Sequence, residues 1–151
     1  MSVVLSFSFF GVESVAVDYS EEAKVIDFVL TDESLENLNK TRASGLIYAY
    51  GIDISKNGTT LLIAGETDCI SAVVKCGFKN LTVERRKTSS DSWEDYYEYG
   101  NVYADSNFAN LSTSLSVASG YQYRVTCKHY AKKSLLVTQT ISNTSGIVTV
   151  S

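Results

Sequence analysis

Apolar and polar residues alternate with a period of two along most of the chain from residue 45 onward. Successive side chains of a β-strand point to opposite faces, so this period predicts half-buried strands and not amphipathic helices. Clusters of Gly, Asn, Ser and Asp separate the runs, as is typical of turns. The alternating runs are LIYAYGIDI (46–54), TTLLIAG (59–65), ISAVVKCGF (70–78), NLTVERRK (80–87), LSTSLSV (111–117), YQYRVTCKHY (121–130), SLLVTQTI (134–141) and GIVTV (146–150).

Short strands at a spacing of about 8–12 residues are the pattern of an all-β sandwich or barrel. We therefore predict an all-β fold over residues 44–151, an immunoglobulin-like or fibronectin-type-III-like sandwich of about seven to nine antiparallel strands. Asn57-Gly58, between the first two runs, is a strong hairpin signal. The chain has no proline, a residue that often blocks a sheet edge. Unblocked edges leave a monomer or a weak edge-strand dimer as the expected states.

The runs also predict which side chains face the core. Leu81 and Val83 are assigned to an inward face, while Thr82, Glu84 and Arg86 are assigned to the outer one. The same alternation places on inward faces two larger sets, one of Ile70, Ala72, Val74, Cys76 and Phe78 and one of Tyr121, Tyr123, Val125 and Cys127.

Two segments precede the predicted sandwich. Residues 3–12 are almost all apolar or Ser, and small residues follow at 14–16. We therefore predict a signal peptide over residues 1–16, although no Lys or Arg precedes the apolar stretch; an alternating first strand is the other interpretation. Residues 17–43 carry an excess of carboxylates and are predicted to be an acidic connector, in which KVIDFVL (24–30) forms a short helix or strand.

The charge of the chain narrows the classes of partner. The formal net charge is −4 and the isoelectric point is about 5.0, whereas a nucleic-acid surface needs a clustered positive field. The only dense basic run, Arg85-Arg86-Lys87, is interpreted as a solvated strand end. No stretch is apolar over the roughly 18 residues that a transmembrane helix needs. We predict a secreted or cell-surface protein without a nucleic-acid partner or a stable membrane span.

The three cysteines, Cys69, Cys76 and Cys127, allow at most one intrachain disulfide. Cys76 and Cys127 both fall on predicted inward faces and are separated by about 50 residues, which is typical of the bridge between the sheets of an immunoglobulin-like sandwich. We predict the Cys76–Cys127 disulfide; the alternatives are no bridge and a pairing with Cys69. The chain has no C-x-x-C motif and a single histidine, His129, so no metal and no cofactor are predicted.

The stretch SDSWEDYYEYGNVYAD (90–105) combines the only tryptophan with four tyrosines and five carboxylates. Aromatic rings in a polar frame are typical of surfaces that bind sugars or proteins. The candidate binding residues are Trp93, Tyr96, Tyr99 and Tyr103.

A structural interpretation of the same stretch is also specific. Trp93 follows a turn, so it would begin the returning strand and cap the core. Tyr97 and Tyr99 are two residues apart and face together, while Tyr96 faces away. The acidic residues would then form a solvated face opposite Arg85-Arg86-Lys87 on the neighbouring strand.

Two parts of the chain resemble a family of small exported proteins of gut Firmicutes that is known only as a domain of unknown function. They are RASGLIYAYGIDISKNGTTLLIAGETDC (42–69), and NLTVERRKTSSDSW (80–93) with GYQYRVTCKHYAKK (120–133). The resemblance covers about residues 42–151 and implies a bacterial, exported, sandwich-like domain without an assigned activity. In antibody-type domains a tyrosine precedes the second cysteine by two residues. Tyr123 precedes Cys127 by four, which argues against an antibody-type domain.

The remaining candidate chemistry is a Cys127–His129 pair on one strand face, since a histidine can activate a thiolate. Such an enzyme also needs an oxyanion hole and an orienting group, and the sequence indicates neither. We predict a non-catalytic exported module that contacts a protein, the cell wall or a glycan at the bacterial surface or in the extracellular space. The alternatives are a structural or accessory domain without a ligand and, more remotely, a small Cys–His enzyme.

Overall fold

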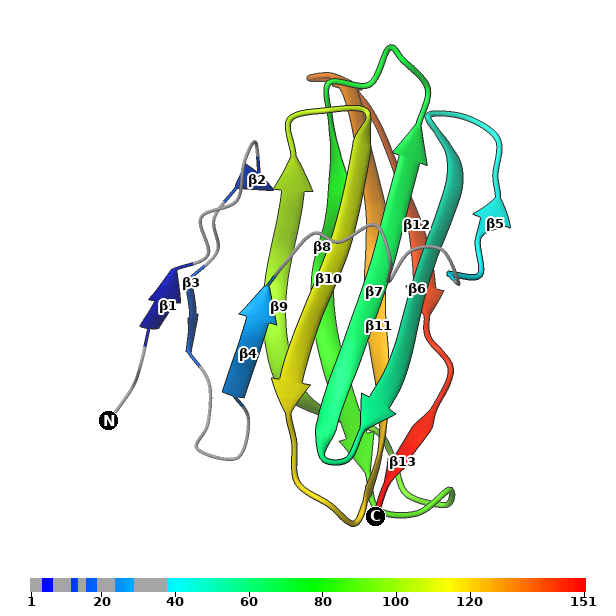
Figure 1. Cartoon of the computed structure of the whole chain (residues 1–151). Coiled ribbons are helices and arrows are strands. Elements are labelled where there is room, and N and C mark those ends of the chain that lie inside the picture. Colours follow the sequence, from blue (N-terminus) through cyan, green and yellow to red (C-terminus); the bar gives the residue numbers. More distant parts are fainter. Residues whose placement is uncertain (1–3, 7–11, 14–15, 19–23, 29–37) are drawn as a thin grey trace.

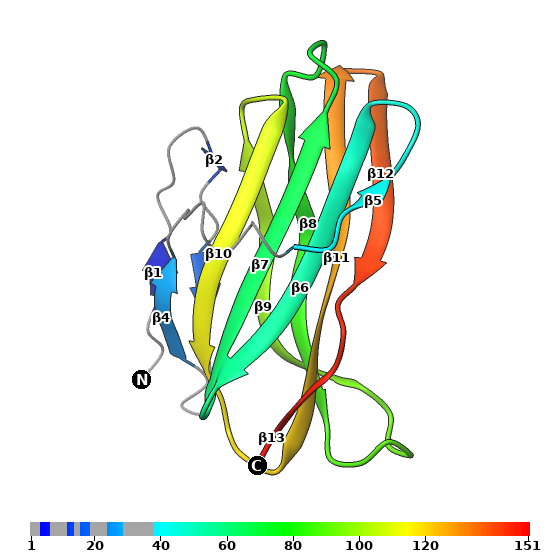
Figure 2. The same ribbon diagram turned by 45° about the vertical axis from the view of Figure 1, so that its right-hand side comes forward.

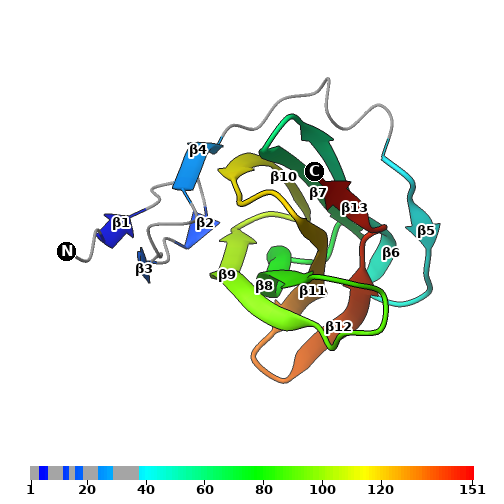
Figure 3. The ribbon, with the colours of Figure 1, turned by 90° about the horizontal axis from the view of Figure 1, so that it is seen from below.

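The computed structural model describes residues 4–6, 12–13, 16–18, 24–28 and 38–151 of the chain. These residues form antiparallel strands joined by turns and loops. Two sheets pack face to face, which confirms the predicted all-β sandwich (Figure 1). Figure 3 shows the layers end-on. Within the described part of the chain, no helix is long and apolar enough to cross a membrane.

The first sheet has the strand order β4-β10-β7-β6-β5. Its strands are β4 (Lys24–Phe28), β10 (Phe108–Ser116), β7 (Thr60–Cys69), β6 (Ile47–Asn57) and β5 (Thr41–Arg42). The second sheet has the order β12-β11-β8-β9-β2, and a further strand, β13, also pairs with β11. Its strands are β12 (Val137–Thr144), β11 (Tyr121–Ser134), β8 (Lys75–Arg86), β9 (Glu94–Ala104), β2 (Val12–Glu13) and β13 (Val148–Val150). The predicted domain 44–151 thus contains eight strands, β6 to β13, within the expected range.

The segment predicted to be an acidic connector, residues 17–43, supplies strands to the first sheet. β4 pairs with β10, with Phe28 opposite Thr113 (Figure 2), and β5 pairs with β6. KVIDFVL therefore contains a strand and not a helix at Lys24–Phe28. Within the predicted leader, β1 (Val4–Ser6) pairs with β3 (Ala16–Asp18). Val12–Glu13, also within the predicted leader, form β2 and pair with β9. The remaining leader positions lie outside the described residues, and the signal peptide stays a prediction.

The predicted hairpin at Asn57-Gly58 is present, with its turn displaced by one residue. Asn57 still pairs with Thr60, so the turn consists of Gly58 and Thr59. Gly58 has a φ of 60°, and Thr59 is not among the residues with positive φ. A positive φ at the first central position alone is the pattern of a type II′ turn, whose twist matches that of the flanking strands.

The core lies between the two sheets and takes its side chains from alternate strand positions. Leu81, Val83 and Val125 are fully buried, as the period of two predicts. Burying an aliphatic side chain of this size contributes about 1.5–3 kcal/mol relative to leaving it exposed. The other large, fully buried side chains are Tyr99, Tyr123, Phe78, Ile47, Leu61, Ile63, Leu111, Leu115 and His129.

The alternation fails at the start of the predicted run 70–78, which lies in a loop and not in a strand. β8 begins at Lys75 and not at Ile70, because residues 70–74 cross from the first sheet to the second. A turn forms there, in which the Val73 N–H donates to the Ile70 carbonyl at 3.0 Å. Ile70 and Val74 are therefore exposed, at 40% and 57%, instead of facing the core.

The predicted Cys76–Cys127 disulfide is absent, because all three cysteines are buried free thiols. β8 and β11 are neighbours in one sheet, so this bridge would not join the two layers. Cys76 pairs with Ala131, four residues along β11 from Cys127. At the rise of a strand this offset is about 14 Å, whereas the Cα atoms of a disulfide lie at most about 7 Å apart. The Cys76 thiol instead donates a hydrogen bond to the Thr67 carbonyl oxygen at 3.8 Å.

The three free cysteines predict how many thiol groups react with a thiol reagent. Chain unfolded in denaturant without reductant should react with a thiol reagent at three sites, because no cysteine is bridged. In the folded state the reaction should be slow, because burial raises the pKa of Cys127 to about 12 and keeps it as the unreactive thiol. Colorimetric thiol titration followed by mass spectrometry measures both. A single reactive thiol in the unfolded chain would contradict the structure.

Gly77 of β8 lies against the backbone of β9. Its φ is 150°, a conformation that side chains disfavour. A Cβ atom at this position would lie 2.2 Å from the Val102 carbonyl oxygen. Because the opposing atom is backbone, no side-chain rotation relieves this overlap.

We expect Gly77→Ala to lower the free energy of unfolding by about 3 kcal/mol, the upper part of the range for overpacked sites. Urea-induced unfolding, followed by fluorescence, measures this change. Gly146→Ala is the matched control, since no atom lies within 4 Å of a Cβ there, and it should change the value by less than about 1 kcal/mol. Equal stabilities of the two variants would refute the proposed close contact between β8 and β9.

Candidate interaction surface

The four predicted binding residues do not share one surface. Tyr99 is 1% exposed and belongs to the core. Tyr96 is half-buried, and the centroid of its ring lies 5.5 Å from that of the buried Tyr123. Trp93 is likewise half-buried and lies in the loop between β8 and β9, at one end of the sandwich (Figure 1).

Tyr103 occupies a different place on the outer face of the second sheet. It pairs with Gly77, which pairs on its other side with Tyr130. Because Gly77 has no side chain, the two tyrosine rings meet across it, with their centroids 4.9 Å apart. Tyr103 is thus 9% exposed and supports the sheet instead of offering a free ring.

The strand period explains this distribution. Tyr97 and Tyr99 face the core together, as predicted, and their rings form an edge-to-face pair at 4.8 Å. Such pairs add about 0.5–1.5 kcal/mol beyond the burial of their area. Most rings of the 90–105 stretch therefore have structural partners, and the candidate surface is reduced to the surroundings of Trp93.

Two guanidinium groups lie over the indole ring of Trp93. The central carbon of Arg86 is 4.4 Å from the ring centroid, and that of Arg124 is 4.3 Å from it. Arg86 ends β8 and Arg124 belongs to β11, so the indole extends from the start of β9 across β8 to the next strand. Each such contact contributes about 0.5–1 kcal/mol at an exposed site. We call Trp93, Arg86, Arg124, Glu84 and Gln122 the Trp93 surface.

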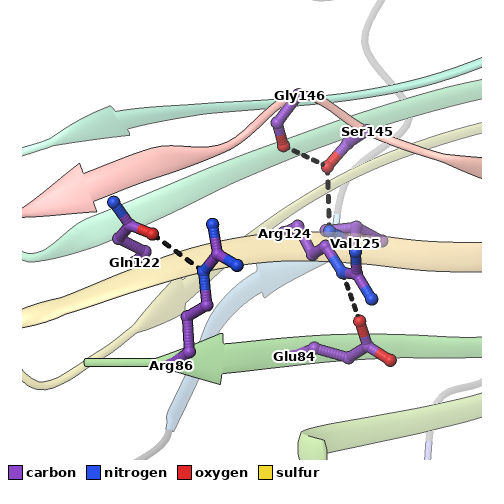
Figure 4. A network of polar contacts seen from close by, with 7 residues as sticks. All are labelled: Glu84, Arg86, Gln122, Arg124, Val125, Ser145 and Gly146. Carbon is purple, nitrogen blue, oxygen red and sulfur yellow. Dashed lines mark hydrogen bonds and ion pairs between the residues drawn. The ribbon is translucent and has the colours of Figure 1, made fainter. Parts of the chain in front are cut away.

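Polar contacts fix the two arginines of the Trp93 surface. Arg124 Nε donates to Glu84 Oε2 at 2.5 Å, and Arg86 Nε donates to Gln122 Oε1 at 2.9 Å (Figure 4). Both contacts follow from the register, which places Glu84 opposite Arg124 and Arg86 opposite Gln122. The arginines are therefore held in defined positions next to the indole.

A third arginine, Arg85, contacts aromatic rings at the same end of the sandwich. The Arg85 guanidinium lies 4.5 Å from the Tyr96 ring and 4.4 Å from the Tyr121 ring. Its Nε donates to Glu94 at 2.8 Å. Glu94 is the register partner of Arg85, so the predicted pairing of acidic residues with the basic run is confirmed at this position.

Sequence reasoning missed Arg124 and Gln122, which belong to the Trp93 surface. They lie about 30 residues from Trp93, and only the register of β8 with β11 brings them to it. Both do fall on the outer face that the alternation predicts for YQYRVTCKHY. The basic run was interpreted as a solvated strand end, but all three of its side chains lie over aromatic rings.

The Cys127–His129 pair lies in the interior. Cys127 Sγ is 3.8 Å from His129 Nε2, and Asn143 Nδ2 is 3.2 Å from the same nitrogen. On the other side of the ring, Thr67 Oγ1 is 2.7 Å from His129 Nδ1. The imidazole also packs between the rings of Tyr50 and Phe78, with centroids 5.0 and 5.4 Å away.

Burial makes both members of this pair neutral. It lowers the pKa of His129 to about 4 and raises the pKa of Cys127 to about 12. A neutral imidazole beside a neutral thiol is not the ion pair that activates a nucleophilic cysteine. His129 has no exposed surface. Among the described residues, no group of three or more His, Cys, Asp or Glu side chains is arranged to hold a metal ion.

Comparison with known proteins gives no match: no family model, no curated protein and no solved structure is significantly similar to the chain. The resemblance to an exported family of gut Firmicutes therefore stays a prediction.

The buried His129 predicts a loss of stability in mild acid. Its pKa is about 4 in the folded chain and about 6.5 in the unfolded chain, so the unfolded state binds more protons between these values. The contribution of neutral His129 to the free energy of unfolding is therefore fully present above about pH 6.5, and it is lost as the pH decreases toward 4. We expect the free energy of unfolding to decrease by about 2 kcal/mol between pH 7 and pH 5.

Urea titrations at the two pH values measure this decrease. His129→Gln removes the only titrating histidine and keeps groups that can hydrogen-bond to Thr67 and Asn143. The variant should lose much less stability between pH 7 and pH 5 than the parent chain does. A parent chain that is equally stable at both values would show that His129 is not held neutral.

Proposed function

We propose that the chain is a non-catalytic exported module that binds a protein partner at the bacterial surface or in the extracellular space. The Trp93 surface is the contact site in this proposal. An immunoglobulin-like or fibronectin-type-III-like topology and a place in an exported bacterial family belong to the same proposal. They are supported by the eight-strand sandwich and by the sequence resemblance.

The observation that carries the proposal is the pair of guanidinium groups over one indole. Polar contacts hold both guanidinium groups in place, so an aromatic ring and two oriented cations are presented together at the surface before any partner binds. Trp93 also lies outside the core cluster. A half-exposed tryptophan between fixed arginines is therefore better explained by a contact with a partner.

The chemistry of the Trp93 surface favours a protein over a sugar. Trp, Tyr and Arg are the residues that dominate the binding energy of protein interfaces. A glycan would need an open aromatic face, whereas the indole is contacted by Arg86 and Arg124. Cell-wall and glycan partners are therefore secondary candidates and are outcomes of the test.

The enclosed Cys127–His129 pair supports the non-catalytic part of the proposal. A substrate would have to reach a thiol that is 5% exposed and an imidazole that is not exposed. The raised pKa of Cys127 also leaves almost no thiolate at neutral pH. The geometry thus favours a role for these side chains in packing.

A structural or accessory domain without a ligand is the second candidate. It is favoured by the internal partners of the tyrosines, since Tyr96, Tyr99 and Tyr103 all contact other rings. In this case the Trp93 surface would only stabilise the end of the second sheet. The two candidates differ in what the loss of Trp93 does to binding.

The test uses the full chain as immobilised bait for the culture supernatant and the cell-wall fraction of the producing cells. A retained protein is identified, purified and titrated against the bait. Trp93→Ala and Arg124→Gln should each weaken its binding by about 30-fold, the effect of losing a dominant interface residue. Cell fractionation should also recover the chain outside the cytoplasm.

Phe108→Ala is the matched control, because Phe108 is an exposed aromatic residue at the other end of the sandwich. It should leave binding unchanged, and urea titration should show that all variants remain folded. Equal binding by Trp93→Ala and the parent would refute the assignment of the site. Retention on purified wall or glycan alone would overturn the choice of a protein partner, and no retention would favour the structural candidate.

A further inference from the structure

The end of the sandwich opposite the Trp93 surface carries a group of exposed apolar side chains. Leu135 and Leu136 form the turn between β11 and β12 and are 84% and 92% exposed. The β7–β8 loop lies at the same end (Figures 1 and 2) and adds Ile70 and Val74. The Val74 N–H donates to the Lys132 carbonyl at 2.9 Å, which fixes this loop beside the turn. We call Leu135, Leu136, Ile70 and Val74 the apolar tip.

Exposure of this degree is not explained by folding. Single exposed apolar residues are common on protein surfaces, but a contiguous group indicates a contact. Two adjacent leucines on a two-residue turn are also unfavourable as turn residues, which are usually Gly, Asn, Asp or Ser. The apolar tip is therefore a surface that lacks its partner.

Lysines lie directly below the apolar tip on the outer face of the second sheet. Lys132 of β11 is the register partner of Lys75 of β8, and Lys128 is the register partner of Lys79. Like charges placed directly opposite each other destabilise a sheet. Lys75 pairs with Asp105 at 3.5 Å, whereas Lys79, Lys128 and Lys132 have no ion pair with any of the described residues.

The net negative charge of the whole chain does not apply to residues 38–151, which carry more basic than acidic residues. Residues 38–151 contain twelve Lys and Arg against nine Asp and Glu. The excess of carboxylates belongs to residues 1–37, which contain eight carboxylates and one lysine. The domain that carries the apolar tip is therefore positively charged. Two of its lysines, the half-buried Lys132 and the exposed Lys133, precede the turn by three and two residues.

We propose that the apolar tip docks onto an anionic lipid bilayer. Leu135 and Leu136 enter the boundary between headgroups and acyl chains, and Lys132, Lys133 and Lys75 contact lipid phosphates. A turn that projects from the end of a rigid sandwich inserts without rearrangement of the core. The contact is peripheral and reversible, since the apolar area is small.

The spacing of the residues fits the depth of such a contact. Lys132 lies three to four residues from the leucines, which is about 10–14 Å along a strand. An interfacial segment places its apolar side chains about 5–10 Å into the headgroup boundary, so Lys132 then reaches the phosphate level. Lys128 lies about another 14 Å away. That distance exceeds the Debye length of about 8–10 Å at physiological salt, so Lys128 contributes less.

The composition of the apolar tip favours lipid over protein. Protein interfaces are enriched in Trp, Tyr and Arg and are depleted of Lys. The tip has the opposite composition, with aliphatic residues and lysines, which attract an anionic lipid surface. The inference does not depend on the Trp93 surface, which lies at the other end and consists of different residues.

The test is flotation of the full chain with vesicles of phosphatidylcholine that contain 30% phosphatidylglycerol. Leu135→Ser with Leu136→Ser should weaken binding by at least about tenfold, because the inserted area is lost. Lys132→Gln with Lys133→Gln should weaken it by about tenfold or more. Raising the salt concentration should weaken the parent chain and should have little effect on the lysine variant.

Ile147→Ser is the matched control, because Ile147 is 51% exposed in the segment between β12 and β13. It should bind as the parent does, and so should Trp93→Ala. All substituted positions except Lys132 and Trp93, which are half-buried, are exposed, and urea titration verifies that each variant is folded. The apolar N-terminal residues are the same in all variants, so a difference is attributable to the tip.

Unchanged binding of the double leucine variant would overturn the proposal, as would failure of the parent chain to float. Equal binding to vesicles of phosphatidylcholine alone would overturn the role of the lysines. A protein partner that the double leucine variant loses, without vesicle binding by the parent, would assign the tip to protein instead of lipid.

Discussion

The pairing of β8 with β11 determines most of what this molecule presents to solvent. Its register sets Glu84 opposite Arg124 and Arg86 opposite Gln122 at one end, and it sets two pairs of lysines opposite each other toward the other end. On the inner face the same strands bring Phe78 beside His129. Because side chains alternate along a strand, a shift of one residue would exchange these two faces. Core and surface are therefore fixed by a single register.

The two ends of the sandwich differ in chemistry although they share these strands. One end combines arginines with aromatic rings, and its charges are largely compensated by carboxylates. The other combines aliphatic side chains with lysines, most of which have no carboxylate partner among the described residues. A rigid sandwich separates the two ends, so both can be occupied at once. In the two proposals taken together, one end contacts a protein partner and the other contacts a lipid surface.

The period of two was sufficient to predict the all-β class and the inward faces of Leu81, Val83 and Val125. It failed at Ile70, Val74 and Leu135, which were assigned to strands but lie in a loop or a turn. An apolar residue in a loop cannot be distinguished by pattern from an apolar residue in a strand. It also misplaced the Cys76–Cys127 bridge, since the alternation assigns a face but not a sheet. Trp93 was identified from composition alone. Its arginine partner on β11 required a register that no local pattern contains.

The pairing of β4 with β10 has a consequence for the order of folding. Phe28 and Thr113 are partners although 85 residues separate them in the chain. The entropy of closing such a long loop is lost before the pairing gains any hydrogen bond. We therefore expect β10 to pair with β7 first and with β4 last, so one edge of β10 stays unpaired in between. During synthesis that open edge, in a chain without proline, is the place where two nascent molecules can join by mistake.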